Sequence, residues 1–225
     1  MILVKNLKKT FIKDGNNIEV LKGLNLSVRR GESLAMLGVS GAGKSTLIHI
    51  LGALDRPSSG EVLFDNTDIF SWNADQLADF RNRKIGFVFQ LHNLLPEFSA
   101  LENTMMPALI NGHSRREAKQ RAETLLQNVG LGHRFHHKSG ELSGGEQQRV
   151  AVARALIMTP DVILADEPTG NLDTETGKKI EDILLELNIN RKITLIVVTH
   201  NKNLADRLQR KVGLRDGRIY DISKT

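Results

Sequence analysis

Short apolar runs alternate with amphipathic segments along most of the chain. The apolar runs have the length of strands, and the longer segments between them carry apolar residues at helical spacing. Apolar strands that alternate with helices predict an α/β fold with a mostly parallel sheet covered on both faces. The predicted strands are 2–7, 18–21, 24–28, 33–37, 61–64, 85–89, 162–165 and 193–198, with a late strand pair around Asp216-Gly217.

Helical spacing is densest in the middle of the chain. Helices are predicted over 44–51, 75–84, 144–158 and 174–187, and the block from Ala100 to about Val129 also has a helical pattern. Ser114, followed three residues later by Glu117, indicates a capping box inside this block. We interpret about 91–159 as a helical subdomain inserted into a single domain over 1–225. The parts on either side, 1–90 and 160–225, then form the sheet core and a β subdomain.

The composition is that of a globular protein. The 225 residues are 40% hydrophobic and 25% charged, and none is cysteine. No apolar run approaches the roughly 18 residues that span a bilayer, and the N-terminal sequence has no secretion signal. Without cysteine there can be no disulfide or thiolate metal site, which fits a cytosolic protein. The net charge of +5 is dispersed, which favours a solvated surface that could face a membrane-embedded partner over nucleic-acid binding.

The segment Gly38-Val-Ser-Gly-Ala-Gly-Lys-Ser45 has the spacing of a phosphate-binding loop. It lies between a predicted strand and a predicted helix, as such a loop must. Glycines let successive N–H groups point at phosphate oxygens, and the helix adds its positive end. We expect Lys44 to reach the β- and γ-phosphates of ATP and Ser45 to coordinate Mg²⁺. The expected nucleotide contacts are Gly38, Ser40, Gly41, Ala42, Gly43, Lys44, Ser45 and Thr46.

Two acidic residues, Asp166 and Glu167, directly follow the apolar run Val162–Ala165. In an open α/β sheet, ligands bind at the carboxyl ends of the strands. Asp166 is therefore expected to orient Mg²⁺, directly or through water, and Glu167 to polarise the water that attacks the γ-phosphate. By itself such a pair could be a solvated strand end. Together with the phosphate loop it predicts ATP hydrolysis.

A second candidate anion site begins the helix predicted over 144–158. Ser143 is a good helix cap, and Gly144 and Gly145 leave open N–H groups. One interpretation is a simple capped helix. The other is a symmetric dimer, because one nucleotide does not need two such sites far apart in one chain. Ser143 to Gly145 of each copy would then cover the phosphates held by the other copy.

With these three motifs in this order, the chain resembles the ATPase subunits of ABC transporters over essentially its whole length. The resemblance implies a P-loop NTPase fold with a RecA-like core, an antiparallel N-terminal β subdomain and an inserted helical subdomain. It implies that Gln90 senses Mg²⁺ and the water, that Asn171-Leu172-Asp173 lies across the dimer interface, and that His200 contacts the γ-phosphate. Phe11 stands where the family stacks an aromatic ring on adenine, but tyrosine is commoner there, and Phe11 could be plain core.

The segment after Gln90 is similar to that of the lipoprotein-releasing subgroup. It runs from Leu91 to Asn103 and is followed by Met106-Pro107. In the family this segment contacts coupling helices of the membrane subunits, so we expect two permease partners near Leu91–Glu102. The resemblance implies a peripheral homodimer on the cytoplasmic face of the bacterial inner membrane. This dimer would power lipoprotein release toward the outer membrane without touching the transported substrate.

Two other functions stay open at this point. The segment Ala165–Asp173 also fits the wider group that includes macrolide exporters and a cell-division ATPase, which signals to a periplasmic cell-wall hydrolase. The residues after Gln90 favour lipoprotein release over both. An ABC ATPase acting on DNA or ribosomes is a further alternative, but such chains usually carry two domains or a coiled-coil insertion, and this chain has no heptad run.

Overall fold

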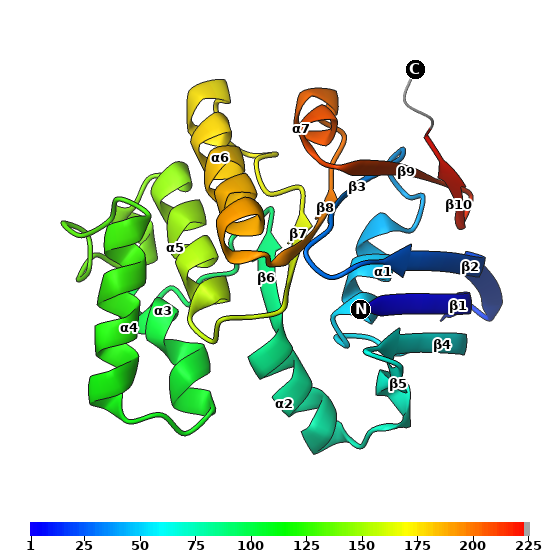
Figure 1. Ribbon diagram of the computed structural model, residues 1–225, viewed down its shortest axis with the longest axis horizontal. Helices are drawn as coiled ribbons and strands as arrows, with labels where there is room; N and C mark the ends of the chain where they lie inside the picture. The colour runs from blue at the N-terminus through cyan, green and yellow to red at the C-terminus, as the bar shows by residue number, and fades with distance from the viewer. Residues whose placement is uncertain (223–225) are drawn as a thin grey trace.

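The computed structural model describes residues 1–222, which form two β-sheets with helices around the larger one (Figure 1). The larger sheet has the order β10-β9-β3-β8-β7-β6. Its strands are β3 (Ser33–Leu37), β6 (Ile85–Phe89), β7 (Val162–Asp166), β8 (Thr194–Val198), β9 (Arg210–Arg215) and β10 (Arg218–Asp221). Five of them run parallel, and β10 is antiparallel to β9. The predicted α/β fold with a mostly parallel central sheet is confirmed.

The smaller sheet is antiparallel and has the order β2-β1-β4-β5. It consists of β1 (Ile2–Lys13), β2 (Asn16–Val28), β4 (Ser59–Phe64) and β5 (Thr67–Asp68). The helices are α1 (Lys44–Leu51), α2 (Ala74–Lys84), α3 (Ala100–Ile110), α4 (Arg115–Asn128), α5 (Gly144–Leu156), α6 (Thr174–Arg191) and α7 (Lys202–Arg207), with short 3₁₀ turns at 69–71 and 139–141. None of these helices is long and apolar enough to cross a membrane.

The central strands are buried on both faces, and their alternate side chains enter two hydrophobic cores. On β8, Leu195 and Val197 join the core that contains residues of α3 to α7. Ile196 and Val198 point the other way, into the core with α1 and the smaller sheet. All five residues of β8 are buried. This two-sided burial explains why the strand is a continuous apolar run instead of an alternating pattern.

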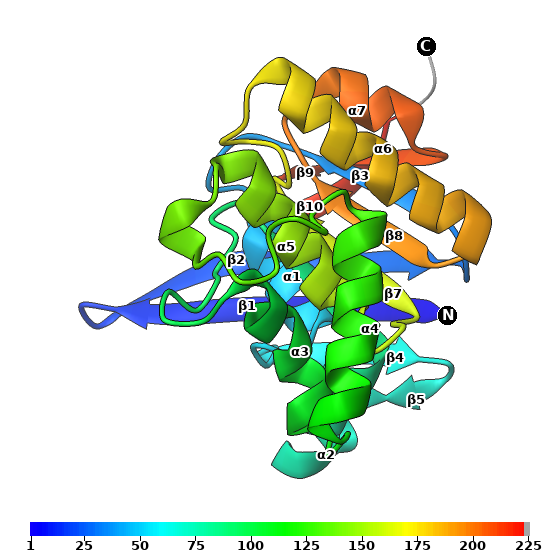
Figure 2. The same cartoon turned by 90° about the vertical axis from the view of Figure 1, so that its left-hand side faces the viewer.

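Several predicted boundaries differ from the structure. The runs 18–21 and 24–28 belong to one strand, β2, which pairs with β1 in a long hairpin that Figure 2 shows projecting from the body. Asp14 and Gly15 close it with φ of 52° and 75°, which suits a two-residue hairpin turn. Shifts of register along β1 and β2 interrupt the alternation that would have marked a single strand.

The helical block 100–129 is two helices, because a turn containing Gly112 at φ 88° separates α3 from α4. The predicted capping box is present, since the Ser114 hydroxyl accepts the N–H of Glu117 and the Glu117 carboxylate accepts the N–H of Ser114. The helix predicted over 144–158 ends at Leu156, and the one predicted over 174–187 continues to Arg191. Helix α7 was not predicted, because six residues are too few to show helical periodicity.

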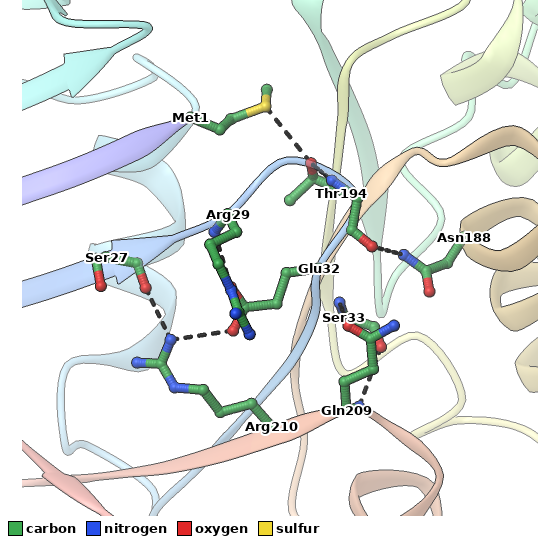
Figure 3. A network of polar contacts seen from close by, with 10 residues as sticks. Met1, Ser27, Arg29, Glu32, Ser33, Asn188, Thr194, Gln209 and Arg210 are labelled. Carbon is green, nitrogen blue, oxygen red and sulfur yellow. Dashed lines mark hydrogen bonds and ion pairs between the residues drawn. The ribbon is translucent and has the colours of Figure 1, made fainter.

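A network of polar contacts links the strands at the amino end of the central sheet (Figure 3). Glu32 is 3% exposed, and its carboxylate accepts bonds from the Arg29 N–H at 2.7 Å and from Arg210 Nη1 at 3.0 Å. The Thr194 hydroxyl accepts the N–H of Gly31 at 2.9 Å. These contacts join the β2–β3 turn to the first residues of β8 and β9. They hold β3 in register with both neighbours, at the end opposite to the loop Gly38–Ser45.

Candidate nucleotide site

The carboxyl ends of the central strands border a cavity of about 560 Å³. Open α/β sheets bind ligands at this end, where side chains from different strands meet. The lining residues come from the β3–α1 loop and the first turn of α1, from the ends of β6, β7 and β8, and from β2. They are Val20, Gly38, Ser40, Gly41, Gly43, Lys44, Ser45, Thr46, Gln90, Asp166, Glu167 and His200.

The loop from Gly38 to Ser45 needs its glycines. Gly43 has φ of 100°, a conformation that L side chains rarely adopt. A Cβ on Gly38 would lie 2.3 Å from the backbone oxygen of Leu214 on β9. The Lys44 ammonium donates to the carbonyls of Gly38 at 2.7 Å and Val39 at 2.9 Å, so its charge lies over the loop.

Helix α1 begins without a side-chain cap, and its N-cap residue is Gly43. Each of the other α-helices has a capping side chain, supplied by Asn73, Ser99, Ser114, Ser143, Asp173 or Asn201. The first N–H groups of a helix have no partner within the helix. At α1 they are therefore available to an anion, and the helix dipole favours one there. This is the chemistry that a triphosphate requires.

A carboxylate and an imidazole meet at the ends of β7 and β8. The Glu167 carboxylate lies 2.9 Å from His200 Nδ1, and the Glu167 N–H donates to the carbonyl of Val198 at 2.9 Å. Glu167 has a left-handed backbone with φ of 47°, a conformation that for a non-glycine residue costs about 1–3 kcal/mol and occurs at functional sites. The Glu167 side chain is 17% exposed and that of His200 74%. Glu167 is thus held firmly, while His200 stays accessible.

Gln90 contacts Asn171, which the family resemblance places at the dimer interface. Its Nε2 donates to Asn171 Oδ1 at 3.0 Å, and Asn171 Nδ2 donates back to the Gln90 carbonyl at 3.4 Å. A Cβ on Gly170 would lie 2.8 Å from Gln90 Nε2. The segment after Glu167 therefore supports Gln90 at the edge of the cavity. Sequence reasoning missed this contact, because no local pattern links two loops that lie this far apart in the chain.

Five of the expected site residues lie outside this lining. Ala42 is buried within the loop. Phe11 is 41% exposed on β1, with the Lys9 ammonium 4.8 Å from its ring centroid. Ser143, Gly144 and Gly145 begin α5, away from the lining of the cavity. Val20 does line the cavity, although no local pattern in the sequence indicates it, because β2 passes beside Gly43 in the folded chain.

The N-terminus of α5 is fixed by a capping box and an ion pair. The Glu146 carboxylate accepts the N–H of Ser143 at 2.8 Å and bonds to Arg134 Nε at 2.9 Å. The Ser143 backbone N–H, and secondarily Arg134, hold the pKa of Glu146 below its ordinary value of 4.5. The ionised carboxylate is therefore part of what orders the Ser143–Gly145 segment.

The charge of Glu146 should make folding stability depend on pH. Because its pKa is lower in the folded than in the unfolded chain, its contribution is present above pH 4.5 and is lost as the pH falls through the folded pKa. Glu146→Gln should lower the free energy of unfolding by about 1 kcal/mol at pH 7 and by less at pH 3.5, as measured by urea titration. The control is Glu97→Gln, a change at an exposed carboxylate. An equal loss at both pH values would contradict this assignment.

Comparisons with known proteins agree with this chemistry. A family profile described as "ABC transporter" matches residues 21–170. The chain is 72% identical over 219 residues to the lipoprotein-releasing system ATP-binding protein LolD of Syntrophus aciditrophicus, covering 97% of this chain and 98% of the relative. Its identity to LolD of Myxococcus xanthus is 52% over 221 residues, covering 98% and 99%.

A solved structure has the same fold. It is a dimer of the ATP-binding cassette MJ0796 in a post-hydrolysis state, bound to ADP and Pi. The TM-score is 0.92 at 41% sequence identity, and the match covers 100% of both chains. The phosphate loop, the uncapped α1 and the carboxylate at the end of β7 are thus found in a fold that carries ATP chemistry. The chain belongs to the ABC transporter family, in which it is an ATP-binding and ATP-hydrolysing subunit.

Proposed function

We propose that the chain powers the release of lipoproteins from the bacterial inner membrane toward the outer membrane. The observation that carries this proposal is the 72% identity, over almost the full length of both chains, to a lipoprotein-releasing system ATP-binding protein. Two copies would bind two ATP between them and work from the cytoplasmic face on two membrane permease subunits. The membrane subunits, and not this chain, would contact the lipoprotein.

The expected site residues divide into three roles. Lys44, the N–H groups of the loop and the start of α1 bind the phosphates. Glu167 accepts the proton of the attacking water, and His200 orients Glu167 and contacts the γ-phosphate. Phe11, which lies on β1 outside the lining of the cavity, would contact the adenine.

Mg²⁺ fits the same cavity. Ser45, Gln90 and Asp166 line it and offer a hydroxyl, an amide oxygen and a carboxylate, which are the hard oxygen ligands that this ion prefers. Asp166 would act directly or through water. When bound, Mg²⁺ would offset negative charge on the phosphate oxygens.

A second copy would complete the site. Ser143 and Gly144 are exposed at the start of α5 and do not line the cavity of their own chain. Val39, at the tip of the phosphate loop, is 73% exposed. In a symmetric dimer these surfaces would face each other, with Ser143, Gly144 and Gly145 of one copy on the phosphates held by the other. The dimeric MJ0796 cassette supports this arrangement.

Ser143→Ala should lower ATP turnover while leaving ATP binding by the single chain unchanged. Removing one hydrogen bond to a charged phosphate should reduce turnover roughly tenfold. Calorimetry on the monomer and a phosphate-release assay separate the two effects. Ser114→Ala is the matched control, because it removes the same kind of capping bond from α4. Weaker ATP binding by the Ser143→Ala monomer would contradict the role in the partner's site.

An apolar groove of about 460 Å³ offers a surface for the membrane subunits. Its lining includes Leu54, Phe87, Ile110 and Met158. Beside it, Leu91 is 72% exposed and Leu95 41%. Exposed apolar side chains gathered around a groove are typical of a protein contact. The expected occupant is an amphipathic cytoplasmic segment of a permease subunit, continuous with a contact along Leu91–Glu102.

The absence of cysteine from the sequence allows a direct test of this contact. Leu95→Cys, labelled with a cysteine-attached photocrosslinker in native membranes, should capture an integral membrane protein with a large periplasmic domain. Ile12→Cys is the control, because Ile12 is 79% exposed and lies on the β1–β2 hairpin.

Depletion of the chain from cells tests the transported substrate, and it should leave outer-membrane lipoproteins in the inner membrane. Normal lipoprotein sorting, with a defect in macrolide resistance or in septal cell-wall cleavage, would favour one of the alternatives.

A further inference from the structure

The chain turns sharply just after Gln90. His92 and Asn93 both have left-handed backbones, with φ of 56° and 49°. Two consecutive non-glycine residues in this region are uncommon, and surrounding structure must hold them there. This turn is the start of the segment Leu91–Glu102.

Arg154, near the end of α5, supplies that support. Its Nη2 donates to the carbonyl of His92 at 2.7 Å, and its Nη1 donates to the carbonyl of Asn93 at 2.6 Å. Burial lowers the pKa of Arg154, and within residues 1–222 no carboxylate forms an ion pair with it. The two carbonyls are therefore the groups that compensate its charge, and charge-assisted bonds of this kind are stronger than neutral ones.

A second side chain of α5 holds the two neighbouring segments of the cavity. Gln148 is fully buried, and its Nε2 donates to the carbonyls of Phe89 at 3.3 Å and Pro168 at 2.6 Å. Phe89 precedes Gln90, and Pro168 follows Glu167. Since a helix rises 1.5 Å per residue, α5 carries Ser143 and Arg154 roughly 16 Å apart on one rigid element.

We propose that Arg154 is a positioning residue that couples the segment Leu91–Glu102 to α5. Its planar guanidinium holds the turn at His92 and Asn93 against α5, so that the turn moves with α5. Because Ser143 to Gly145 begin α5, the turn also moves with them. A force on the segment thereby reaches the part of the chain that would cover the partner's nucleotide. This proposal rests on the proposed function, because a membrane subunit would exert the force on the segment Leu91–Glu102.

Hydrogen exchange measured by mass spectrometry tests the coupling on the purified chain. The non-hydrolysable analogue AMP-PNP with Mg²⁺ serves as the probe, and calorimetry confirms its binding to each variant. In the wild type, the analogue should slow exchange in 91–99 and in α5 together. In Arg154→Gln, 91–99 should exchange at least about fivefold faster and should no longer respond to the analogue, whereas α5 should still respond.

Arg56→Gln is the matched control. Arg56 also donates to two backbone carbonyls, those of Phe70 and Trp72, each at 3.1 Å, and neither carbonyl belongs to the turn at 92–93. Exchange in 91–99 should remain that of the wild type in this variant. If Arg154→Gln does not fold, Arg154→Lys replaces it, because lysine keeps the charge and loses the planar fork. The same pattern with a smaller change is then expected.

Three results would overturn the coupling. The first is an exchange rate of 91–99 that is unchanged in the Arg154 variants. The second is an increase in exchange rate that is spread evenly over the whole chain. The third is an exchange rate of 91–99 in the wild type that does not change when AMP-PNP is added. None of these results bears on lipoprotein release, which the crosslinking and depletion experiments test separately. Conversely, a different transported substrate would leave the exchange pattern intact.

Discussion

Glu167→Gln is expected to abolish most ATP turnover and to leave ATP binding intact. A positioned general base contributes about 10²–10⁴-fold to a rate, and the amide of glutamine cannot accept the proton of the attacking water. Glutamine keeps the size of the side chain and an oxygen that can accept a bond from His200, so the cavity should keep its shape. A phosphate-release assay at saturating ATP should therefore show turnover at least about 100-fold lower.

The same variant should accumulate as an ATP-bound dimer, because a site that cannot hydrolyse cannot reopen. Gel filtration with ATP and Mg²⁺ should show the dimer peak, and the wild type should stay mostly monomeric after turnover. Glu186→Gln, at an exposed position on α6, controls for the loss of one carboxylate. Turnover like that of the wild type in Glu167→Gln would remove Glu167 as the base.

Lys44→Ala should lose most of the affinity for ATP. The ammonium now donates to the carbonyls of Gly38 and Val39, and in the nucleotide complex it would bind phosphate oxygens. One or two hydrogen bonds to a charged phosphate are worth about 1.5–3 kcal/mol each, which predicts an affinity lower by roughly 100-fold. The fold should survive, because the loop keeps its glycines and α1 keeps its buried side.

Isothermal calorimetry with ATP measures this loss, and far-UV circular dichroism checks the fold. Lys178→Ala removes an exposed positive charge from α6, so it separates the local effect of Lys44 from the change in net charge. Unchanged ATP affinity in Lys44→Ala would rule out the loop as the phosphate site.

Short-range features of the site could be predicted from the sequence. The loop Gly38–Ser45 takes its shape from its own glycines, and β7 ends at Asp166, one residue after the apolar run. The structure gathers Gln90, Asp166, Glu167 and His200 around one cavity, as parallel strands with polar residues at their ends would. In each case neighbouring residues encode the conformation that matters.

Features that depend on distant pairing could not be predicted in this way. Val20 reaches the cavity because β2 passes beside Gly43. Gln90 and Asn171 meet because β6 and β7 are adjacent in the sheet. The hydrogen bonds from Arg154 to the turn at 92–93 join a helix to a loop about 60 residues earlier in the chain. No local periodicity carries such information, since each contact exists only after the sheet and its helices have packed.

The strand order also determines when, during synthesis, the nucleotide site can form. Strand β3 ends at Leu37, but its two neighbours, β8 and β9, begin at Thr194 and Arg210. At about 5–20 residues per second, the ribosome makes the intervening chain in roughly 8–30 s. Throughout that time β3 has no partner strand, and Gly38 lacks the β9 backbone against which it packs. A nascent chain that stops short of β8 should therefore not bind ATP, and its unpaired apolar strand is a surface for chaperones until translation is nearly complete.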